Sequence, residues 1–346
     1  MRVRSLAGSV VFRKWPVVAV GVFLAWVAYV FWSPGLSVRD GRHDLGRNGI
    51  WLQHGWLGAN EWFYRNGKQD RIPEFRGRQH IDQLASFLNR QHVTDVFPHV
   101  APARRDGGLP QVDYEQVERF LDGFSGSRVL PWIGGVLGKT VSLADSQWRH
   151  RFVASTTNLL AQHPRLAGIH LNIEPCPSGD PDFLRLLDEL RQALSADKTL
   201  SVAAFPPPTF LHPFDHIHWD KAYFGEVSRR ADQIVVMMYD TGLPLVKPYR
   251  GLAQSWTRKV LRWTTGSQVL FGVPTYDDAG VGYHHPSVEN LENALSGIHA
   301  GLAEFGELPE QYQGIAIYSE WETDDTEWDY WAKHFMCQSA GANGLC

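Results

Sequence analysis

The chain has 346 residues, of which 44% are hydrophobic and 20% are charged, so it is long enough for one large barrel or two modest domains and too apolar for a disordered protein. Its formal net charge is -4 and its lysines and arginines are scattered, which argues against a nucleic-acid partner. The 14 Trp and 11 Tyr residues exceed what a core alone requires. Because aromatic faces stack on sugar rings, carbohydrate becomes the candidate ligand class.

An apolar run without a charged residue occupies residues 16–32 near the N-terminus. Its length is close to the lower limit of roughly 17 residues for a helix that spans a bilayer. Four basic residues precede it: Arg2, Arg4, Arg13 and Lys14. We predict a basic cytoplasmic segment over 1–15, a transmembrane signal anchor over 16–32, and the remaining chain on the periplasmic or extracellular side. A cleaved signal peptide is the alternative, but no small-x-small site follows the run; flanking charges argue against a buried core helix.

Short β-branched or aromatic runs then alternate with segments of helical periodicity, after a polar linker over 33–47. The alternation predicts repeated β–α units and a parallel sheet. Eight runs are candidate strands, at residues 49–56, 94–100, 128–136, 168–174, 199–205, 233–239, 269–276 and 314–318. Eight such units over 48–336, followed by a tail over 337–346, fit an α/β fold of the (β/α)8 TIM-barrel type.

A doubly wound open sheet is the main alternative fold, but it expects a glycine-rich phosphate turn after the first strand, and Gly55-Trp56-Leu57-Gly58 is not that motif. The intervening helices have apolar residues at helical spacing, as in Phe183, Leu186 and Leu190. Asp180 is the expected N-cap of that helix, with Pro181 at its first position.

The run from Ala167 to Glu174 delivers one carboxylate at its C-terminal end, immediately before Pro175. Side chains two apart on a strand share a face, so Asn172 and Glu174 point the same way, with His170 one step deeper. Catalytic groups of parallel barrels lie at this end of the strands. We therefore expect Glu174 and Asn172 to be catalytic.

Other candidate strands also end in polar or aromatic residues. The carboxyl ends of barrel strands meet at one mouth, where such side chains can bind a sugar. The candidates for substrate binding are His54, Trp56, His99, Trp132, Asp240, Tyr276, Asp277, Tyr318, Glu320 and Trp321.

Three motifs make the chain resemble the glycoside hydrolase family 18 superfamily, the chitinase-like barrels. The fourth strand of that family carries Asp-Gly-x-Asp-x-Asp-x-Glu, and residues 167–174 keep its glycine and its final Glu while replacing all three Asp residues. The Met-x-Tyr-Asp motif of its sixth strand is matched at residues 237–240, and Gly-x-Pro-x-Tyr of its seventh strand is matched at residues 272–276. Trp321 stands where the eighth strand commonly ends near a Trp.

The resemblance implies a retaining hydrolysis in which the 2-acetamido oxygen of the substrate attacks the anomeric carbon. Glu174 would protonate the leaving oxygen, and Tyr239 would help to hold the acetamido group. The family has an acid two residues before this Glu, and here that position is Asn172. The resulting Asn-x-Glu arrangement is similar to that of the endo-β-N-acetylglucosaminidases of family 85. Such a mechanism requires no metal or organic cofactor.

Two alternatives remain open. In the first, a glycosidase uses Glu174 as acid/base and Asp277, Asp278 or Glu320 as nucleophile. In the second, the chain is a non-catalytic, membrane-tethered protein of carbohydrate binding or polysaccharide assembly.

The three cysteines add one hypothesis, a disulfide between Cys337 and Cys346 in the tail, while Cys176 stands beside the expected site. No Cys-x-x-Cys or His-x-x-x-His spacing supports a zinc site.

Overall fold

The computed structural model describes residues 15–58, 60–210, 212–278, 280 and 283–336. The chain divides between Pro34 and Gly35 into two compact units. The tail that carries Cys337 and Cys346 lies outside the described residues, so their pairing stays a hypothesis.

The first unit contains one helix, α1 (Trp15–Phe31), which has no charged residue. Among the residues that the structure describes, no helix combines the length and the apolar character needed to cross a membrane. The transmembrane anchor over 16–32 stays a prediction.

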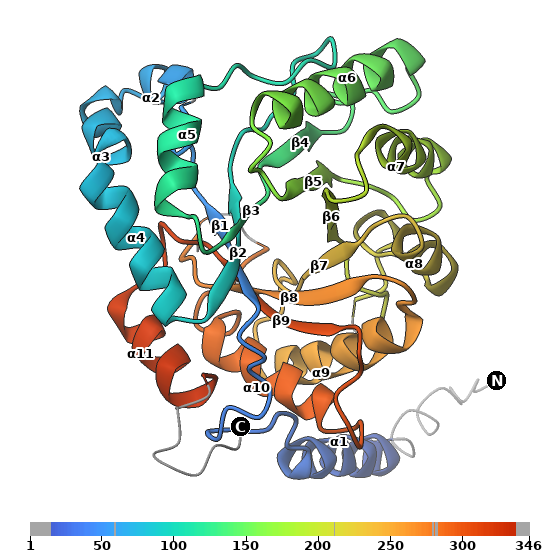
Figure 1. Cartoon of the computed structure of the whole chain (residues 1–346). Helices are drawn as coiled ribbons and strands as arrows, with labels where there is room; N and C mark the ends of the chain where they lie inside the picture. Colours follow the sequence, from blue (N-terminus) through green and yellow to red (C-terminus); the bar gives the residue numbers. More distant parts are fainter. Residues whose placement is uncertain (1–14, 59, 211, 279, 281–282, 337–346) are drawn as a thin grey trace, which may run out of the picture. The chain divides into compact units, whose positions relative to one another are not determined.

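The second unit alternates strands and helices from β1 to α11 (Figure 1). Its strands are β1 (Asn48–Leu52), β2 (Val93–Pro98), β3 (Arg128–Val129), β4 (Trp132–Val136), β5 (Gly168–Glu174), β6 (Thr199–Ala204), β7 (Gln233–Met237), β8 (Gln268–Pro274) and β9 (Tyr312–Tyr318). Its helices are α2 (Asn60–Arg65), α3 (Ile72–Arg76), α4 (Arg78–Arg90), α5 (Tyr114–Gly123), α6 (Ser146–Gln162), α7 (Pro181–Ala193), α8 (Lys221–Ser228), α9 (Val246–Trp263), α10 (Leu291–Leu302) and α11 (Asp325–His334), with short 3-10 turns at Gln69–Arg71 and Asp215–Ile217.

All strand pairs are parallel, in the order β3-β2-β1-β9-β8-β7-β6-β5-β4. The two ends of this sheet, β3 and β4, are consecutive pieces of one segment, separated only by Leu130 and Pro131. That segment bonds to β2 through Leu130 N and Val96 O at 3.0 Å, and to β5 through His170 N and Pro131 O at 3.0 Å. The sheet thus curls until its ends meet, which gives the predicted TIM-like α/β fold.

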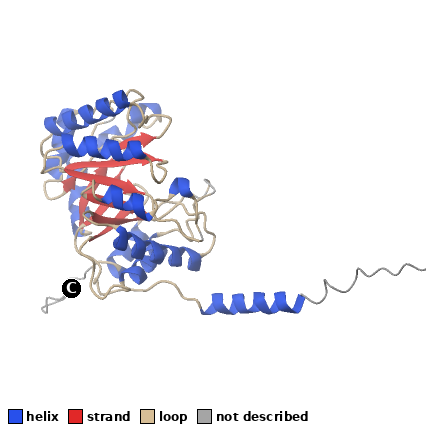
Figure 2. Cartoon of the chain, turned by 90° about the vertical axis from the view of Figure 1, so that its right-hand side faces the viewer, coloured by secondary structure: helices blue, strands red, loops and turns tan. Residues whose placement is uncertain are grey.

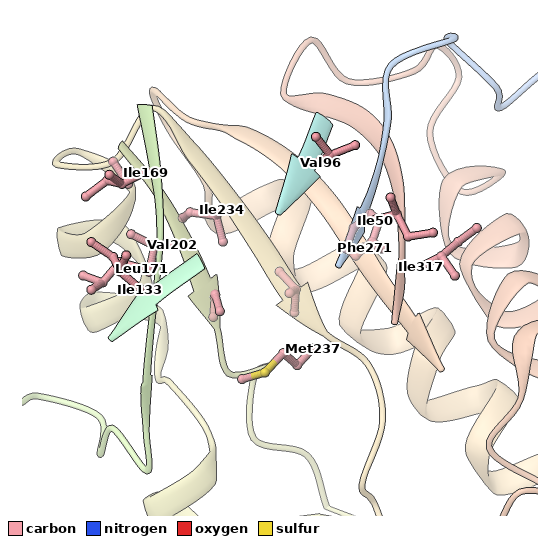
Figure 3. Packing of buried hydrophobic residues seen from close by; sticks show 14 of the residues in the cluster. Ile50, Val96, Ile133, Ile169, Leu171, Val202, Ile234, Met237, Phe271 and Ile317 are labelled. Atoms are coloured by element: carbon pink, nitrogen blue, oxygen red, sulfur yellow. The ribbon is translucent and has the colours of Figure 1, made fainter. Parts of the chain in front are cut away.

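Alternating side chains of the strands form two apolar layers. Outward residues such as Ile50, Ile169 and Ile317 belong to the layer between strands and helices, and Figure 3 shows labelled members of it from β1, β2 and β4 to β9. The helices cover the strands on the outside (Figure 2). The intervening inward residues form a separate interior cluster of Trp51, Phe97, Leu130, Val235, Leu270 and Ala316. The period of two along each strand produces both layers.

Below this interior cluster the barrel contains a polar network centred on Asp95, which is fully buried. Asp95 accepts hydrogen bonds from Arg128 at 2.9 Å, from Gln233 at 2.6 Å and from Gln313 at 3.0 Å. Because these residues come from β2, β3, β7 and β9, one carboxylate joins opposite walls of the barrel.

Two predictions about local structure differ in outcome. Asp180 is the N-cap of α7 as predicted, and it accepts from the backbone N–H of Asp182 and Phe183. The segment predicted as a linker contacts the barrel well before residue 47: Val38 and His43 are buried, and the His43 carbonyl accepts from the Tyr312 hydroxyl at 2.8 Å.

Candidate active site

Glu174 is the last residue of β5 and is the one exposed residue of that strand. Asn172, which is buried, donates from Nδ2 to Glu174 Oε1 at 2.6 Å. The surrounding rim dehydrates the carboxyl group and raises the pKa of Glu174; the charge of Asp240 adds to this effect, whereas the Asn172 hydrogen bond opposes it. A carboxyl group with a raised pKa is suited to donate a proton near neutral pH.

Gly134 on β4 allows the backbone of β5 to approach β4 closely at Asn172. Its φ angle is +126°, and a Cβ atom at this position would lie 1.9 Å from the Asn172 carbonyl oxygen. Only glycine tolerates both conditions, so this residue sets the position of Asn172 relative to the neighbouring strand.

His170 completes the inward face of β5 but lies inside the barrel instead of at the mouth. Its Nε2 accepts from Trp51 Nε1 at 3.0 Å and its Nδ1 bonds to Ser201 Oγ at 2.9 Å. Full burial lowers the pKa of His170 to about 3, so the ring is neutral. It therefore belongs to the interior packing and makes no hydrogen bond to Asn172.

Tyr239 and Asp240 follow β7 and lie beside Glu174. The Tyr239 ring stacks on Tyr318, with centroids 5.4 Å apart, and burial together with the charges of Glu174 and Asp240 raises the pKa of Tyr239. Asp240 has a positive φ of 58° and accepts a hydrogen bond from the Tyr276 hydroxyl. Tyr276 is itself buried, so its hydroxyl holds the Asp240 carboxylate in a fixed position.

His284 lies next to Asp240, and Glu289 holds the backbone that follows it. His284 lies with Nδ1 3.5 Å from Asp240 Oδ1 and 3.9 Å from Glu289 Oε2, and its ring stacks on Tyr276 at 4.1 Å. The neighbouring carboxylates raise the pKa of His284 against the effect of its burial. Glu289 also accepts from Thr241 N at 2.9 Å, so the turn after Tyr239 is held at several points.

A hollow of about 330 Å³, here called the Glu174 hollow, opens at these residues. Its lining includes Glu174, His212, Tyr239, Asp240, Trp256 and Tyr283.

A second hollow of about 660 Å³, the Glu320 hollow, lies beside the first. Its lining includes His54, Trp62, His99, Trp132, Tyr318 and Glu320. Tyr318 joins the two hollows because its ring lies on Tyr239. Burial raises the pKa of Glu320 to about 7, against the opposing effect of the Gln53 backbone N–H and the Trp56 indole.

The aromatic wall of the Glu320 hollow is held by two histidines. His54 and His99 bond to each other through their Nδ1 atoms at 2.7 Å, and His99 lies edge-on to Trp132 at 4.1 Å. Burial lowers the pKa of His54 to about 4, helped by the nearby charge of Arg65. Burial also lowers the pKa of His99, so both rings are neutral; they meet edge to face at an interplanar angle of 65°.

Of the remaining residues predicted to bind substrate, one lines a hollow and two do not. Trp321 lines the Glu320 hollow. Trp56 is 4% exposed and packs on Phe75 and Phe120, so its predicted role in substrate binding is wrong: the ring belongs to the core. Asp277 is exposed on the loop after β8 and lines neither hollow.

Several residues of these hollows were not predicted. Trp62 lies on α2, a short helix missed in the sequence, and stacks on His54 at 4.9 Å. His212, Trp256 and Tyr283 come from loops and a helix whose position relative to Glu174 depends on the closed barrel. The run of three aromatic residues from Trp62 to Tyr64, between Glu61 and Arg65, is the local signal that could have indicated this site.

The fold is similar to those of solved chitinases and spore cortex-lytic enzymes. SleL, a spore cortex-lytic enzyme of Bacillus cereus, aligns with 84% of this chain and 74% of its own at 13% identity and a TM-score of 0.54. A chitinase from Bacteroides thetaiotaomicron aligns with 87% of this chain and 99% of its own at 14% identity and a TM-score of 0.53. The fold of this chain is similar to that of these two enzymes.

A third such barrel, the chitinase ChiC of Aspergillus fumigatus, aligns with 80% of this chain and 92% of its own at 16% identity and a TM-score of 0.51. No protein-family model and no curated protein matches the sequence. At these identities the likeness concerns the fold alone, and the chemistry has to be argued from the residues of this chain.

Proposed function

We propose that this chain is a glycoside hydrolase that cleaves glycans containing N-acetylhexosamine, with Glu174 as the general acid and base and the substrate's acetamido oxygen as the nucleophile. The chitinase-like fold supports the reaction class. Substrate-assisted hydrolysis needs one proton donor, and Glu174 has the position and the raised pKa for that task.

The observation that carries the acetamido step concerns Asn172. Its Nδ2 is engaged with Glu174, whereas its Oδ1 is buried and has no hydrogen-bond partner among the described residues. A buried acceptor without a partner costs free energy, which an incoming N–H donor would recover. The acetamido N–H of the substrate is such a donor, and its binding there would turn the acetamido oxygen toward the anomeric carbon.

Different residues of the mouth have different roles in this mechanism. Glu174 protonates the leaving oxygen and then, as carboxylate, takes a proton from the water that opens the cyclic intermediate. Tyr239 lies beside Glu174 as a hydroxyl donor for the acetamido oxygen, with Asp240 held by Tyr276 and His284 next to it. Stacking of sugar rings falls to Tyr318 and Trp132, which line the neighbouring hollow.

The test is hydrolysis of N-acetylglucosamine oligosaccharides and of glucose oligosaccharides of equal length by the full-length protein and by Glu174→Gln. Wild type should cleave only the N-acetylated series, and Glu174→Gln should lower kcat roughly 10²- to 10⁴-fold while binding persists. Glu307→Gln, an exposed Glu before β9, is the matched control and should keep full turnover.

Other outcomes would select the alternatives. Cleavage of plain glucosides would favour a two-carboxylate mechanism, although Asp277 and Asp278 are exposed and Glu320 lines the other hollow. Binding of the N-acetylated series without any cleavage would leave a non-catalytic carbohydrate-binding protein.

We further propose that the charge-free segment over 16–32 anchors the protein at a membrane, with the barrel on the periplasmic or extracellular side. Its composition and the basic residues before it support this assignment. The full-length protein should stay with membranes after a high-salt, alkaline wash, and Leu24→Arg should release most of it. Release of wild type by the same wash would rule out the anchor.

A further inference from the structure

A third hollow of about 490 Å³ continues the mouth beyond the Glu320 hollow, and it is lined by arginines. We call it the arginine hollow, and its lining includes His54, Glu61, Trp62, Arg65, Arg104 and Arg105. Arg65 is the last residue of α2, whereas Arg104 and Arg105 lie in the loop after β2. Two separate segments thus bring three guanidinium groups around one hollow.

These arginines are not occupied elsewhere. Within the described part of the chain, none of the three has an acidic partner within ion-pair distance or a side-chain hydrogen bond. By contrast, Arg71 of the adjoining hollow pairs with Glu74 at 3.1 Å. Glu61 is the acidic group on the lining of the arginine hollow, so positive charge predominates there.

The arginine hollow is continuous with the proposed active site. It shares His54 and Trp62 with the Glu320 hollow, and Tyr318 connects that hollow to Tyr239 beside Glu174. A bound glycan that fills the Glu174 hollow and extends over Trp132 and Trp62 therefore reaches the arginines.

We propose that the arginine hollow is an anion subsite that selects glycans carrying carboxylates several sugars away from the cleaved bond. That the ligand is a glycan rests on the proposed function, whereas its negative charge is inferred from the arginines alone. A neutral chain offers guanidinium groups only uncharged hydroxyl and acetamido oxygens, whereas a carboxylate adds a negative charge and matches the planar fork of Arg with paired hydrogen bonds. Trp62, which stacks on His54 and has Lys68 Nζ 5.1 Å from its ring centroid, adds an aromatic side chain to the wall of this hollow.

The experiment compares kcat/KM of the full-length protein on neutral N-acetylglucosamine oligomers with that on two acidic polymers, in which N-acetylglucosamine alternates either with a uronic acid or with a sugar bearing a lactyl carboxylate. The two acidic probes distinguish the sources of the carboxylate. Wild type should prefer at least one of them over the same polymer with its carboxyl groups reduced to alcohols. The triple variant Arg65→Gln/Arg104→Gln/Arg105→Gln should lower this ratio about 10- to 100-fold, and added salt should lower it in wild type.

Arg151→Gln, on the exposed face of α6 and outside the three hollows, is the matched charge control and should leave the ratio unchanged. Equal ratios for wild type and the triple variant on both acidic polymers would overturn the subsite. The charge can also be tested without turnover, by binding of both polymers to Glu174→Gln with and without the arginines. Salt-sensitive binding that depends on the arginines, without any cleavage by wild type, would support the subsite and reject the hydrolase. Cleavage at the same rate with and without the arginines would support the hydrolase and reject the subsite.

Discussion

At the scale of single residues, the proposed chemistry depends on the pair Asn172 and Glu174. Their shared face follows from the period of two along a strand, so the sequence predicts it directly. The hydrogen bond between them, 2.6 Å long, makes the pKa of Glu174 depend on Asn172.

This dependence predicts a shift in the pH profile. The Asn172 N–H stabilises the Glu174 carboxylate and so lowers its pKa; Asn172→Ala removes this effect, and the pKa of Glu174 rises further. Because the protonated form is the acid, activity is lost as pH rises through this pKa, and the alkaline limb of kcat/KM should move to higher pH in the variant. Maximal kcat should fall about 10²-fold, since the variant lacks the acceptor that we propose for the acetamido group.

The pH dependence of kcat/KM for wild type and Asn172→Ala measures the position of the alkaline limb. Asn158→Ala, an exposed Asn on α6, is the control and should leave it in place. A limb at the same pH in Asn172→Ala would show that the hydrogen bond does not act on the proton donor.

At the scale of elements, the sequence predicts β5 with both of its bounds and places seven other strands within a few residues. The largest difference is the run over 128–136, which the structure divides into β3 and β4. Pro131 has no N–H to donate to the ladder, so regular pairing stops there although the chain continues in the same direction. The first strand ends at Leu52 instead of Trp56, because the chain turns at Gly55, where φ is +101°.

The contact between β4 and β5 predicts a large effect of a small substitution. Gly134→Ala places a Cβ atom 1.9 Å from the Asn172 carbonyl oxygen at a φ of +126°, so the strands must separate. We expect a loss of about 3 kcal/mol in the free energy of unfolding. Gly126→Ala, whose Cβ would meet nothing within 4 Å, should change it by less than about 1 kcal/mol.

Thermal unfolding followed by near-ultraviolet circular dichroism measures both variants. Equal melting temperatures for the two would mean that β4 shifts without cost.

At the scale of the whole molecule, closure of the barrel depends on polar as well as apolar contacts. Asp95 holds Arg128, Gln233 and Gln313, which lie up to 218 residues away in sequence. No local pattern marks such a group, because its partners become neighbours only when the sheet closes.

Asp95→Ala therefore should destabilise the protein strongly. It leaves a guanidinium group and two amides without their buried acceptor, which costs about 3–5 kcal/mol. Asp329→Ala, which removes an exposed ion pair with Lys333, should cost less than about 1 kcal/mol. Urea unfolding of the full-length protein compares them, and a small loss for Asp95→Ala would show that water replaces the missing carboxylate.

The sequence by itself determined the β–α alternation, the strand that ends in Glu174 and the shared face of Asn172, because strand periodicity and the position of a strand end are local properties. Only the tertiary structure decided which aromatic residues face a ligand. Trp56 is buried on Phe75, whereas Trp62, six residues later, faces the mouth. The same holds for the arginine hollow: Arg65 and Arg104 are 39 positions apart in the sequence, and they line one hollow because closure of a parallel barrel brings all strand ends and their loops to one mouth.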